Sequence, residues 1–237
     1  MQAIILAGGK GTRLKPYTTI FPKPLVPVGD IPILEIVIRQ LKHHGFKKIT
    51  IAVGHLAELI EAFFGDGKKW GVEISYSLED KPLGTAGPIA LVDDLENDFL
   101  IMNGDLLTSI NFKDLMEKHK KNKAISTISI YKKDHKIELG ILELDKDNNL
   151  TDYIEKPTKT YPVSMGIYIF NKKILGYIPK NKHLDLPDLI KTLISKKEKI
   201  HGYLFKDKWL DIGQEKDYLN AIEEFNIHRK LFLKDEK

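Results

Sequence analysis

Three glycines among four residues follow the first apolar run of the chain. The segment 8–13 (Gly-Gly-Lys-Gly-Thr-Arg) comes directly after residues 1–7, which have the pattern of a strand buried on both faces. Glycines let the backbone approach a ligand closely and point several N–H groups into one concavity, which suits a triphosphate. Arg13 adds a bidentate phosphate donor that stays charged. The spacing matches neither the Walker loop nor the dinucleotide fingerprint, so the segment is a different phosphate loop or a glycine-rich turn without a ligand.

A lysine between two prolines and two aspartates at strand ends complete the first set of candidates. Pro22 and Pro24 fix the backbone around Lys23, so its ammonium group extends from a stiff segment. Asp105 follows a buried apolar run, at the strand end where open α/β sheets bind ligands. Asp211 lies in a second strand-to-turn segment. The two carboxylates are candidate ligands of one Mg²⁺, or else turn and cap residues.

Five elements in this order resemble the signature of the sugar-1-phosphate nucleotidyltransferases, and the resemblance covers essentially the whole chain. The elements are Gly8-Gly9-Lys10-Gly11-Thr12-Arg13-Leu14 with Pro22-Lys23-Pro24, Pro82-Leu83-Gly84-Thr85-Ala86-Gly87-Pro88, Asn103-Gly104-Asp105, Glu155-Lys156-Pro157, and Trp209-Leu210-Asp211-Ile212-Gly213. The resemblance implies a Mg²⁺-dependent enzyme that transfers a nucleoside monophosphate from an NTP to a sugar 1-phosphate and releases pyrophosphate. Because the nucleophile is already an anion, such a site needs cations more than a strong base.

The resemblance also assigns roles to individual residues. The implied catalytic residues are Arg13, Lys23 and Asp105, and the implied metal ligands are Asp105 and Asp211. The implied nucleotide-binding residues are Leu6, Ala7, Gly8, Gly9, Gly11, Thr12, Arg13, Lys23, Glu79, Pro82, Gly84 and Thr85. The implied sugar-phosphate-binding residues are Gly140, Glu155, Lys156 and Gly166. The stretch 164–166 (Ser-Met-Gly) departs from the Asn-Ala-Gly of many relatives, which leaves the contacts to the sugar hydroxyls open.

The choice of base and sugar depends on fewer residues. Where relatives that select uracil or thymine commonly carry a glutamine, this chain has Glu79 and Asp80, and a carboxylate can accept hydrogen bonds from guanine N1–H and N2–H₂. The segment 83–91 is most similar to the mannose-1-phosphate guanylyltransferases, so we expect GTP and mannose 1-phosphate or a related manno-configured sugar. The alternatives are a uridylyl- or cytidylyltransferase acting on a different sugar 1-phosphate, and a non-catalytic regulatory paralogue. The intact charged motif residues argue against the paralogue.

The elements that must position these residues alternate between strand and helix patterns. Strands are predicted over 1–7, 48–53, 72–77, 99–103, 125–132, 140–144, 163–170 and 200–205, and helices over 33–44, 56–64, 87–95, 186–196 and 217–232. In the last helix we expect Leu219, Ile222, Phe225 and Ile227 to face inward. With the resemblance, this order predicts a three-layer α/β/α Rossmann-like nucleotidyltransferase fold with a mixed, mostly parallel sheet. We expect one catalytic domain over 1–237, with a nucleotide-binding half at about 1–110 and a sugar-phosphate-binding half at about 111–237.

Composition excludes several other classes of protein. The 237 residues include 37 Lys plus Arg and 33 Asp plus Glu, a net charge of +4, and this charge is dispersed without a recognition motif, which argues against a nucleic-acid partner. The absence of cysteine excludes disulfides, thiolate nucleophiles and zinc ribbons. No run approaches the ~20 apolar residues of a membrane span and no signal peptide is recognisable, so we expect a cytoplasmic protein without a membrane partner.

The C-terminal part of the sequence and the question of assembly complete the expectations. No hexapeptide-repeat pattern is present, so we expect the C-terminal β-helix of the longer guanylyltransferases to be lacking. Many single-domain relatives associate, which leaves a homo-oligomer open. The lysine-rich stretches 118–123 and 196–199 are expected to be solvated helix ends.

Overall fold

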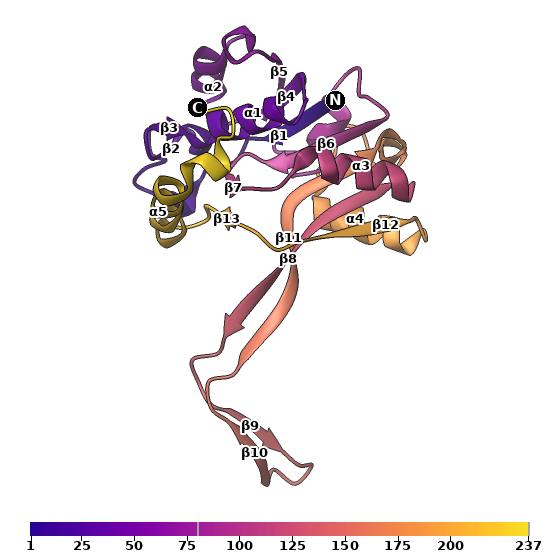
Figure 1. Ribbon diagram of the computed structural model, residues 1–237. Helices are drawn as coiled ribbons and strands as arrows, with labels where there is room; N and C mark the ends of the chain where they lie inside the picture. The colour runs from indigo at the N-terminus through magenta and orange to yellow at the C-terminus, as the bar shows by residue number, and fades with distance from the viewer. Residues whose placement is uncertain (80, 237) are drawn as a thin grey trace.

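A seven-stranded sheet forms the centre of the computed structural model, which describes residues 1–79 and 81–236 (Figure 1). Its strands in spatial order are β12 (Ile200–Phe205), β8 (Ser126–Lys136), β11 (Thr158–Asn171), β6 (Asp98–Asn103), β1 (Gln2–Leu6), β4 (Lys48–Val53) and β5 (Glu73–Leu78). All of them run in one direction except β11, which is antiparallel to β6 and β8. The prediction of a mixed, mostly parallel sheet is therefore confirmed.

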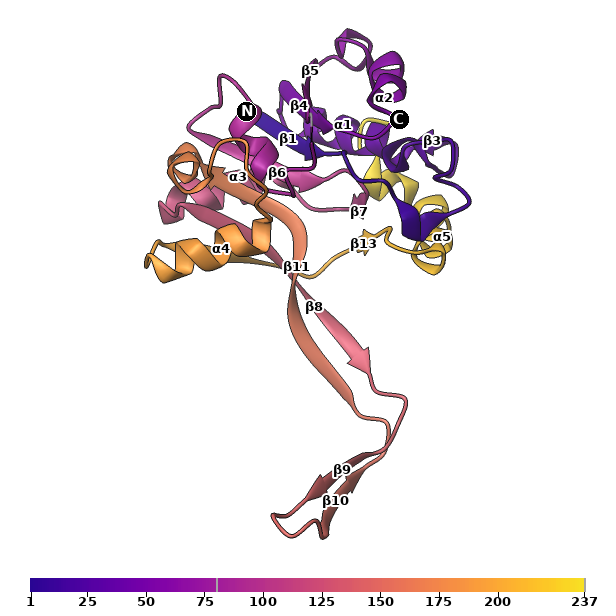
Figure 2. The ribbon, with the colours of Figure 1, turned by 180° about the vertical axis from the view of Figure 1, so that it is seen from behind.

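Helices cover both faces of this sheet, which gives the predicted three layers (Figures 1 and 2). One face packs against α1 (Ile33–His43), α2 (Ala57–Phe64) and α3 (Phe112–Asn122), and the other against α4 (Leu186–Ser195) and the 3-10 helices Gly87–Leu91 and Lys172–Tyr177. Strand β1 shows why: Ala3 and Ile5 contact the first layer and Ile4 the second, since side chains alternate along a strand. No helix within the described ranges is both long and apolar enough to cross a bilayer.

Smaller elements close the carboxyl edge of the sheet. The 3-10 helices Thr12–Leu14 and Lys23–Leu25 lie in the segment after β1, whereas Lys68–Trp70 lies between α2 and β5, at the other edge. β2 (Pro27–Val28) and β3 (Ile31–Pro32) form a short hairpin, and β7 (Leu106–Thr108) and β13 (Trp209–Asp211) form a separate antiparallel pair. A third core joins helix α5 (Glu215–Phe232) to the loop that follows β1, through buried Leu14, Val28 and Phe225. The C-terminal helix thus supports the glycine loop from behind.

Two predicted helices differ from the structure. Over 87–95 only the 3-10 helix Gly87–Leu91 forms, because the backbone is extended at Val92 (φ −88°, ψ 117°) and left-handed at Asp94 (φ 52°). In α5 the prediction that Leu219 and Ile227 face inward is wrong, since they are 55% and 64% exposed. The inward face is instead formed by Tyr218, Ala221, Phe225 and Phe232, and Ile222 is only partly buried.

Two strands leave the body as a long arm, which Figures 1 and 2 both show projecting away from the sheet. Strands β8 and β11 shift register between Ser164 and Tyr168 and then continue to pair, from Ser164 opposite Ile130 to Thr158 opposite Lys136. The tip is a separate hairpin of β9 (Ile141–Leu144) and β10 (Leu150–Ile154). The predicted strand 140–144 is therefore present, but it pairs at the tip of the arm and not in the central sheet.

Candidate active site

The glycine loop lies at the carboxyl end of β1, where it contacts the end of the neighbouring strand β4. A Cβ atom on Gly54, just after β4, would lie 3.1 Å from the carbonyl oxygen of Gly8, so the absence of a side chain at Gly54 eases this close approach. Gly11 has a left-handed backbone (φ 60°), and its carbonyl accepts a hydrogen bond of 2.7 Å from the Thr18 hydroxyl. The loop is therefore held by its own glycines and by Thr18.

Lys23 and Asp105 form an ion pair beside this loop. The Lys23 Nζ atom lies 2.5 Å from Asp105 Oδ2, and the two side chains are only 12% and 23% exposed. The 3-10 turn that begins at Lys23 positions the lysine, and Asp105 follows strand β6 directly. The second carboxylate oxygen of Asp105, Oδ1, is buried and has no hydrogen-bond partner. An unpartnered buried acceptor is costly, so this atom is suited to a bound cation.

Asp211 and Arg13 reach the same place from other elements. Asp211 lies opposite Leu106 in the antiparallel β13–β7 pair, which brings it next to Asp105. Burial raises the pKa of the Asp211 carboxyl and the Asp105 charge raises it further, whereas the charges of Lys23 and Arg13 lower it. A Cβ atom on Gly213 would lie 3.9 Å from Arg13 Nη1 and 4.0 Å from Asp211 Oδ1. Two cations and two carboxylates therefore converge.

The pair of aspartates fits a divalent cation. Within residues 1–79 and 81–236 no group of three or more His, Cys, Asp or Glu side chains converges as a metal site. Mg²⁺, however, is commonly held by one or two carboxylates together with water and substrate phosphates. The Oδ1 atom of Asp105 has no hydrogen-bond partner, and the charge of Asp105 raises the pKa of the neighbouring Asp211 carboxyl. Both features fit a cation held between the two carboxylates.

These groups border a cleft of about 630 Å³. Its lining includes most of the residues predicted to bind the nucleotide, namely Leu6, Ala7, Gly8, Gly9, Arg13, Lys23, Glu79, Pro82, Gly84, Thr85 and also Asp105. Gly11, Thr12 and Asp211 are not part of this lining. His55, Lys81 and His183 also line the cleft and were not predicted. Of these three, His55 follows the end of β4 and was detectable by the rule that ligands bind at the carboxyl ends of strands.

The far side of the cleft carries Glu79 and Thr85 in different environments. One Glu79 oxygen accepts a hydrogen bond of 2.7 Å from the Leu83 amide, and the other would lie 3.4 Å from a Cβ atom on Gly8. Burial raises the pKa of the Glu79 carboxyl. The Thr85 amide donates to Asp185 and its hydroxyl accepts from the Leu186 amide, so Thr85 also anchors the start of α4. Asp80, the other predicted base-reading acid, lies outside the described residues.

The structure separates the predicted sugar-phosphate residues from this cleft. Gly166 lies at the root of the arm, with a left-handed backbone (φ 71°) that packs against Asn103. Gly140, Glu155 and Lys156 lie near the tip of the arm, where Glu155 accepts a hydrogen bond of 2.9 Å from Tyr153. None of these three lines the cleft. The physical reason is the β8–β11 ladder, which continues past the edge of the sheet and carries the tip away from the body.

Comparisons with known proteins agree with this geometry. A family model described as nucleotidyl transferase matches residues 2–226. A UTP–glucose-1-phosphate uridylyltransferase of Synechocystis sp. is 33% identical over 94% of this chain, and a mannose-1-phosphate guanyltransferase of Yarrowia lipolytica is 34% identical over 93%. The chain spans only 62% and 63% of the lengths of these two proteins.

Solved structures give the same result. The crystal structure of HddC from Yersinia pseudotuberculosis superposes with a TM-score of 0.73 at 27% identity and covers 94% of this chain and 99% of that one. The structure of HddC complexed with GMP-PN superposes with a TM-score of 0.72 at 25% identity. Most of the curated relatives are mannose-1-phosphate guanylyltransferases.

Proposed function

The chain belongs to the nucleotidyl transferase family, and on that premise we propose that it transfers a nucleoside monophosphate from a nucleoside triphosphate to a sugar 1-phosphate. The observation that carries the proposal is the Lys23–Asp105 pair beside the glycine loop, with Arg13 and Asp211 at the same strand edge. Two polyanionic substrates repel one another. A site of fixed cations in a cleft reduces that repulsion without a general base, because the attacking phosphate oxygen is already charged.

Each residue has a role in this proposal. Backbone N–H groups of the glycine loop hold the triphosphate, and Arg13 contacts the oxygens of the leaving pyrophosphate. Lys23 contacts the α-phosphate, where negative charge increases in the transition state. Lys156, from the arm, holds the phosphate of the incoming sugar. These residues position and stabilise the reacting groups, and none of them is asked to take a proton.

We assign Asp105 and Asp211 as the residues that hold Mg²⁺. Mg²⁺ held by these carboxylates would neutralise phosphate charge. Lys23 occupies one oxygen of Asp105 and leaves the buried Oδ1 for the metal. Lys23 therefore orients the carboxylate in addition to contacting substrate.

Guanine and a manno-configured sugar are the proposed specificity. Glu79 supports guanine, since its carboxylate faces the glycine loop and can accept from both N1–H and N2–H₂. The guanylyltransferase relatives and the HddC complex with GMP-PN give further support. The uridylyltransferase of Synechocystis sp. is equally similar in sequence, so UTP is the base to test against.

A release assay for pyrophosphate tests this function. Purified protein with Mg²⁺ is offered each of the four ribonucleoside triphosphates with a panel of sugar 1-phosphates, and we expect turnover with GTP and mannose 1-phosphate. Asp105→Asn and Asp211→Asn are expected to lower turnover at least ~100-fold, a typical loss for one group that stabilises transition-state charge. Asp207→Asn, an exposed acid four residues from Asp211, is the matched control and should retain activity.

The outcomes separate the parts of the proposal. A protein that turns over none of the substrate pairs would overturn the enzymatic function. Turnover with UTP or CTP alone would overturn the guanine assignment. Full turnover in either aspartate variant would refute the metal site. Thermal unfolding distinguishes chemistry from folding, because Asp211→Asn removes the charge repulsion between Asp211 and Asp105 and should leave the melting temperature unchanged or raised.

A further inference from the structure

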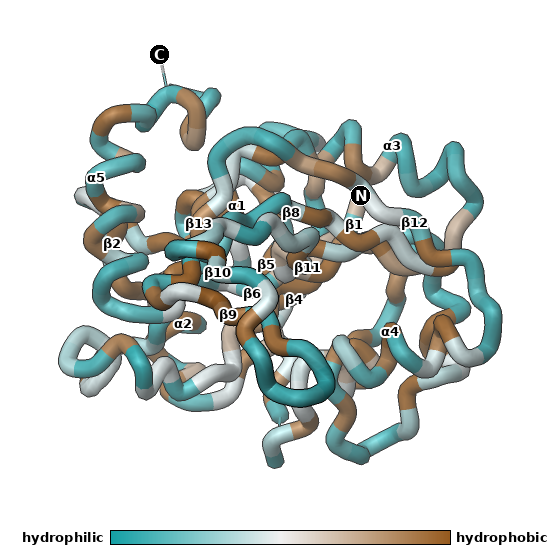
Figure 3. The backbone as a smooth tube through the Cα atoms, turned by 90° about the horizontal axis from the view of Figure 1, so that it is seen from below, coloured by the Kyte–Doolittle hydropathy of each residue, from teal (hydrophilic) through white to brown (hydrophobic). Residues whose placement is uncertain are grey.

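The tip of the arm has one apolar face whose large side chains are more than half exposed. Leu142 pairs with Tyr153 and Leu144 with Leu150 across the β9–β10 hairpin, so all four side chains lie on the same face. They are 53% to 58% exposed. Figure 3, viewed toward the end of the arm, shows hydrophobic stretches on this hairpin next to hydrophilic ones. A two-stranded hairpin without a core is marginally stable in water, so this face needs a covering surface.

Charge indicates the kind of surface that covers it. The tip, residues 141–156, carries two lysines and five acids, and its net charge is 2 − 5 = −3. The rest of the chain has 35 − 28 = +7. The cleft is lined by Lys10, Arg13, Lys23 and Lys81 and by the acids Glu79 and Asp105, so the net charge of its lining is 4 − 2 = +2. An acidic tip and a cationic cleft are complementary, which favours their association.

The arm does not reach the cleft of its own chain. It leaves the sheet at the ligand edge, where Gly166 packs against Asn103 of the cleft. From there the ladder between 130–136 and 158–164 is unbroken and holds the tip away from the body (Figures 1 and 2). Bending the arm within this ladder would break its backbone hydrogen bonds. A second copy can meet the tip without breaking any of them.

We propose that two copies of this chain exchange arms, so that each tip docks at the cleft of the other copy and supplies Lys156 to it. The role of Lys156 in this inference rests on the proposed function, whereas the contact between the tip and the other copy does not. Ile20 and Phe21, which are 68% and 52% exposed directly before Lys23, provide an apolar rim for the apolar face of the tip. A two-fold axis between the copies makes the two contacts identical and closes the assembly.

The size of the arm fits a stable interface. A standard interface uses about 20 to 30 residues on each side, and one arm (residues 132–162) provides about 30. Lys156 has a left-handed backbone (φ 42°) directly before Pro157, a conformation that is costly for a residue with a Cβ atom. Such strain is commonly found where surroundings fix a functional side chain, and the partner cleft would provide those surroundings.

The mass of the protein in solution tests the exchange without any substrate. Sedimentation of the wild type should give twice the chain mass of 27.1 kDa. Replacing residues 134–160 by Asn-Gly should give a folded monomer, because Lys133 and Tyr161 are paired and a two-residue turn can join them. Leu142→Ser with Leu144→Ser should weaken the dimer at least ~10-fold, whereas Leu219→Ser, at an equally exposed site on α5, should not. A wild-type monomer, or a dimer that persists without the arm, would overturn the proposal.

Mixing two inactive variants tests whether the site is shared. Lys23→Ala inactivates the cleft and Lys156→Ala the arm, and each is expected to be inactive alone. After equal amounts are unfolded together and refolded, about half of the dimers are mixed and have one complete site of two, so about one quarter of the wild-type activity should return. If the mixture stays as inactive as its components, the arm serves its own chain and the exchange is wrong. A dimer that depends on the arm but turns over no substrate would overturn the proposed activity and leave the exchange standing.

Discussion

Glu79 is the residue on which the choice of base should depend. Its carboxylate is fixed on one side by the Leu83 amide, and its free oxygen faces the glycine loop. Glu79→Gln places an amide there, whose N–H groups meet the donor edge of guanine but can pair with the O4 carbonyl of uracil. We expect the kcat/KM for GTP to fall ~10- to 100-fold, mainly through KM because the base is remote from the reacting phosphorus, and the ratio of UTP to GTP turnover to rise.

An acid at the start of β5, the strand that ends just before Glu79, provides the control. Glu73→Gln changes charge by the same amount at an exposed position of β5 and should leave both kcat/KM values unchanged. Kinetics with GTP and UTP under identical conditions measure the ratio. If Glu79→Gln and Glu73→Gln have the same ratio as the wild type, Glu79 does not contact the base.

At the residue scale, the sequence predicts which residues line the cleft better than it predicts where the sugar-phosphate residues lie. Lys23, Asp105 and Glu79 follow strand ends or prolines, and parallel strands bring such positions to one edge whatever the details of packing. The position of Lys156 depends on how far β8 and β11 remain paired beyond the sheet. That length is set by cross-strand contacts between distant segments, so the motif around Lys156 identifies the residue but not where it lies.

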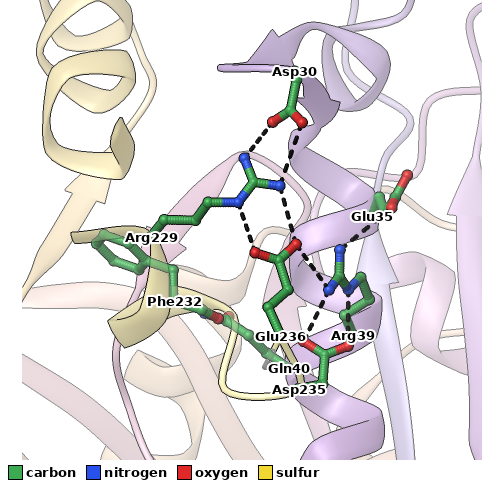
Figure 4. A network of polar contacts seen from close by, with 8 residues as sticks. All are labelled: Asp30, Glu35, Arg39, Gln40, Arg229, Phe232, Asp235 and Glu236. Atoms are coloured by element: carbon green, nitrogen blue, oxygen red, sulfur yellow. Dashed lines mark hydrogen bonds and ion pairs between the residues drawn. The ribbon is translucent and has the colours of Figure 1, made fainter. Parts of the chain in front are cut away.

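At the scale of elements, a charged network fixes the end of α5 against α1 and the β2–β3 turn (Figure 4). Arg229 donates to both carboxylate oxygens of Asp30 and, at 2.7 Å and 3.0 Å, to Glu236. Arg39 donates to Asp235 at 2.9 Å and 3.0 Å and to Glu236 at 3.1 Å. Hydrogen bonds from Arg229 hold the pKa values of Asp30 and Glu236 below their usual range.

Removing Arg229 should therefore destabilise the protein in a pH-dependent way. Lowered carboxyl pKa values stabilise the folded state above the ordinary pKa of about 4, and this contribution disappears as pH falls through the folded-state values. Because these side chains are partly solvated, we expect Arg229→Ala to cost about 1 kcal/mol at pH 7, or about 2 to 4 °C in melting temperature. The difference from the wild type should shrink below about pH 4.

The melting temperatures of Arg229→Ala and Lys230→Ala, measured between pH 3 and 8, test this pH dependence. Lys230 is exposed at the same end of α5, so its loss should have little effect at any pH. A difference for Arg229→Ala that stays constant down to pH 3 would mean that the arginine acts through packing on Phe225, which lies 5.1 Å from its guanidinium carbon, and not through the carboxylates.

Helices and strands formed as predicted where one strong hydrophobic pattern indicates their position. Strand β1 and helix α1 have long apolar patterns and formed where expected. Helix α3 was missed because only Phe112, Leu115, Met116 and His119 are buried among polar residues, although their i, i+3, i+4, i+7 spacing was present. In α5 the pattern allows two neighbouring faces, and packing against the loop after β1 selects the one with Tyr218 and Ala221.

At the scale of the whole molecule, the body and the arm differ in what stabilises them. The body has three buried clusters around one sheet, whereas the tip hairpin pairs only with itself. Local opening free energies range from about zero up to the global value, according to how much packing a segment has. An isolated tip therefore exchanges its amide hydrogens quickly, and a tip docked in a partner exchanges them slowly.

Hydrogen exchange at two protein concentrations tests this difference. At protein concentrations above the dissociation constant of the dimer, we expect the amides of β9 and β10 to be protected. After a ~100-fold dilution to a concentration below that constant, their protection should fall by a comparable factor, because docking is a mass-action equilibrium. Peptides that cover β6 provide the internal control, since their protection reports opening of the body and should not change with dilution. Equal protection of β9 and β10 at both concentrations would show that the tip is stabilised within one chain.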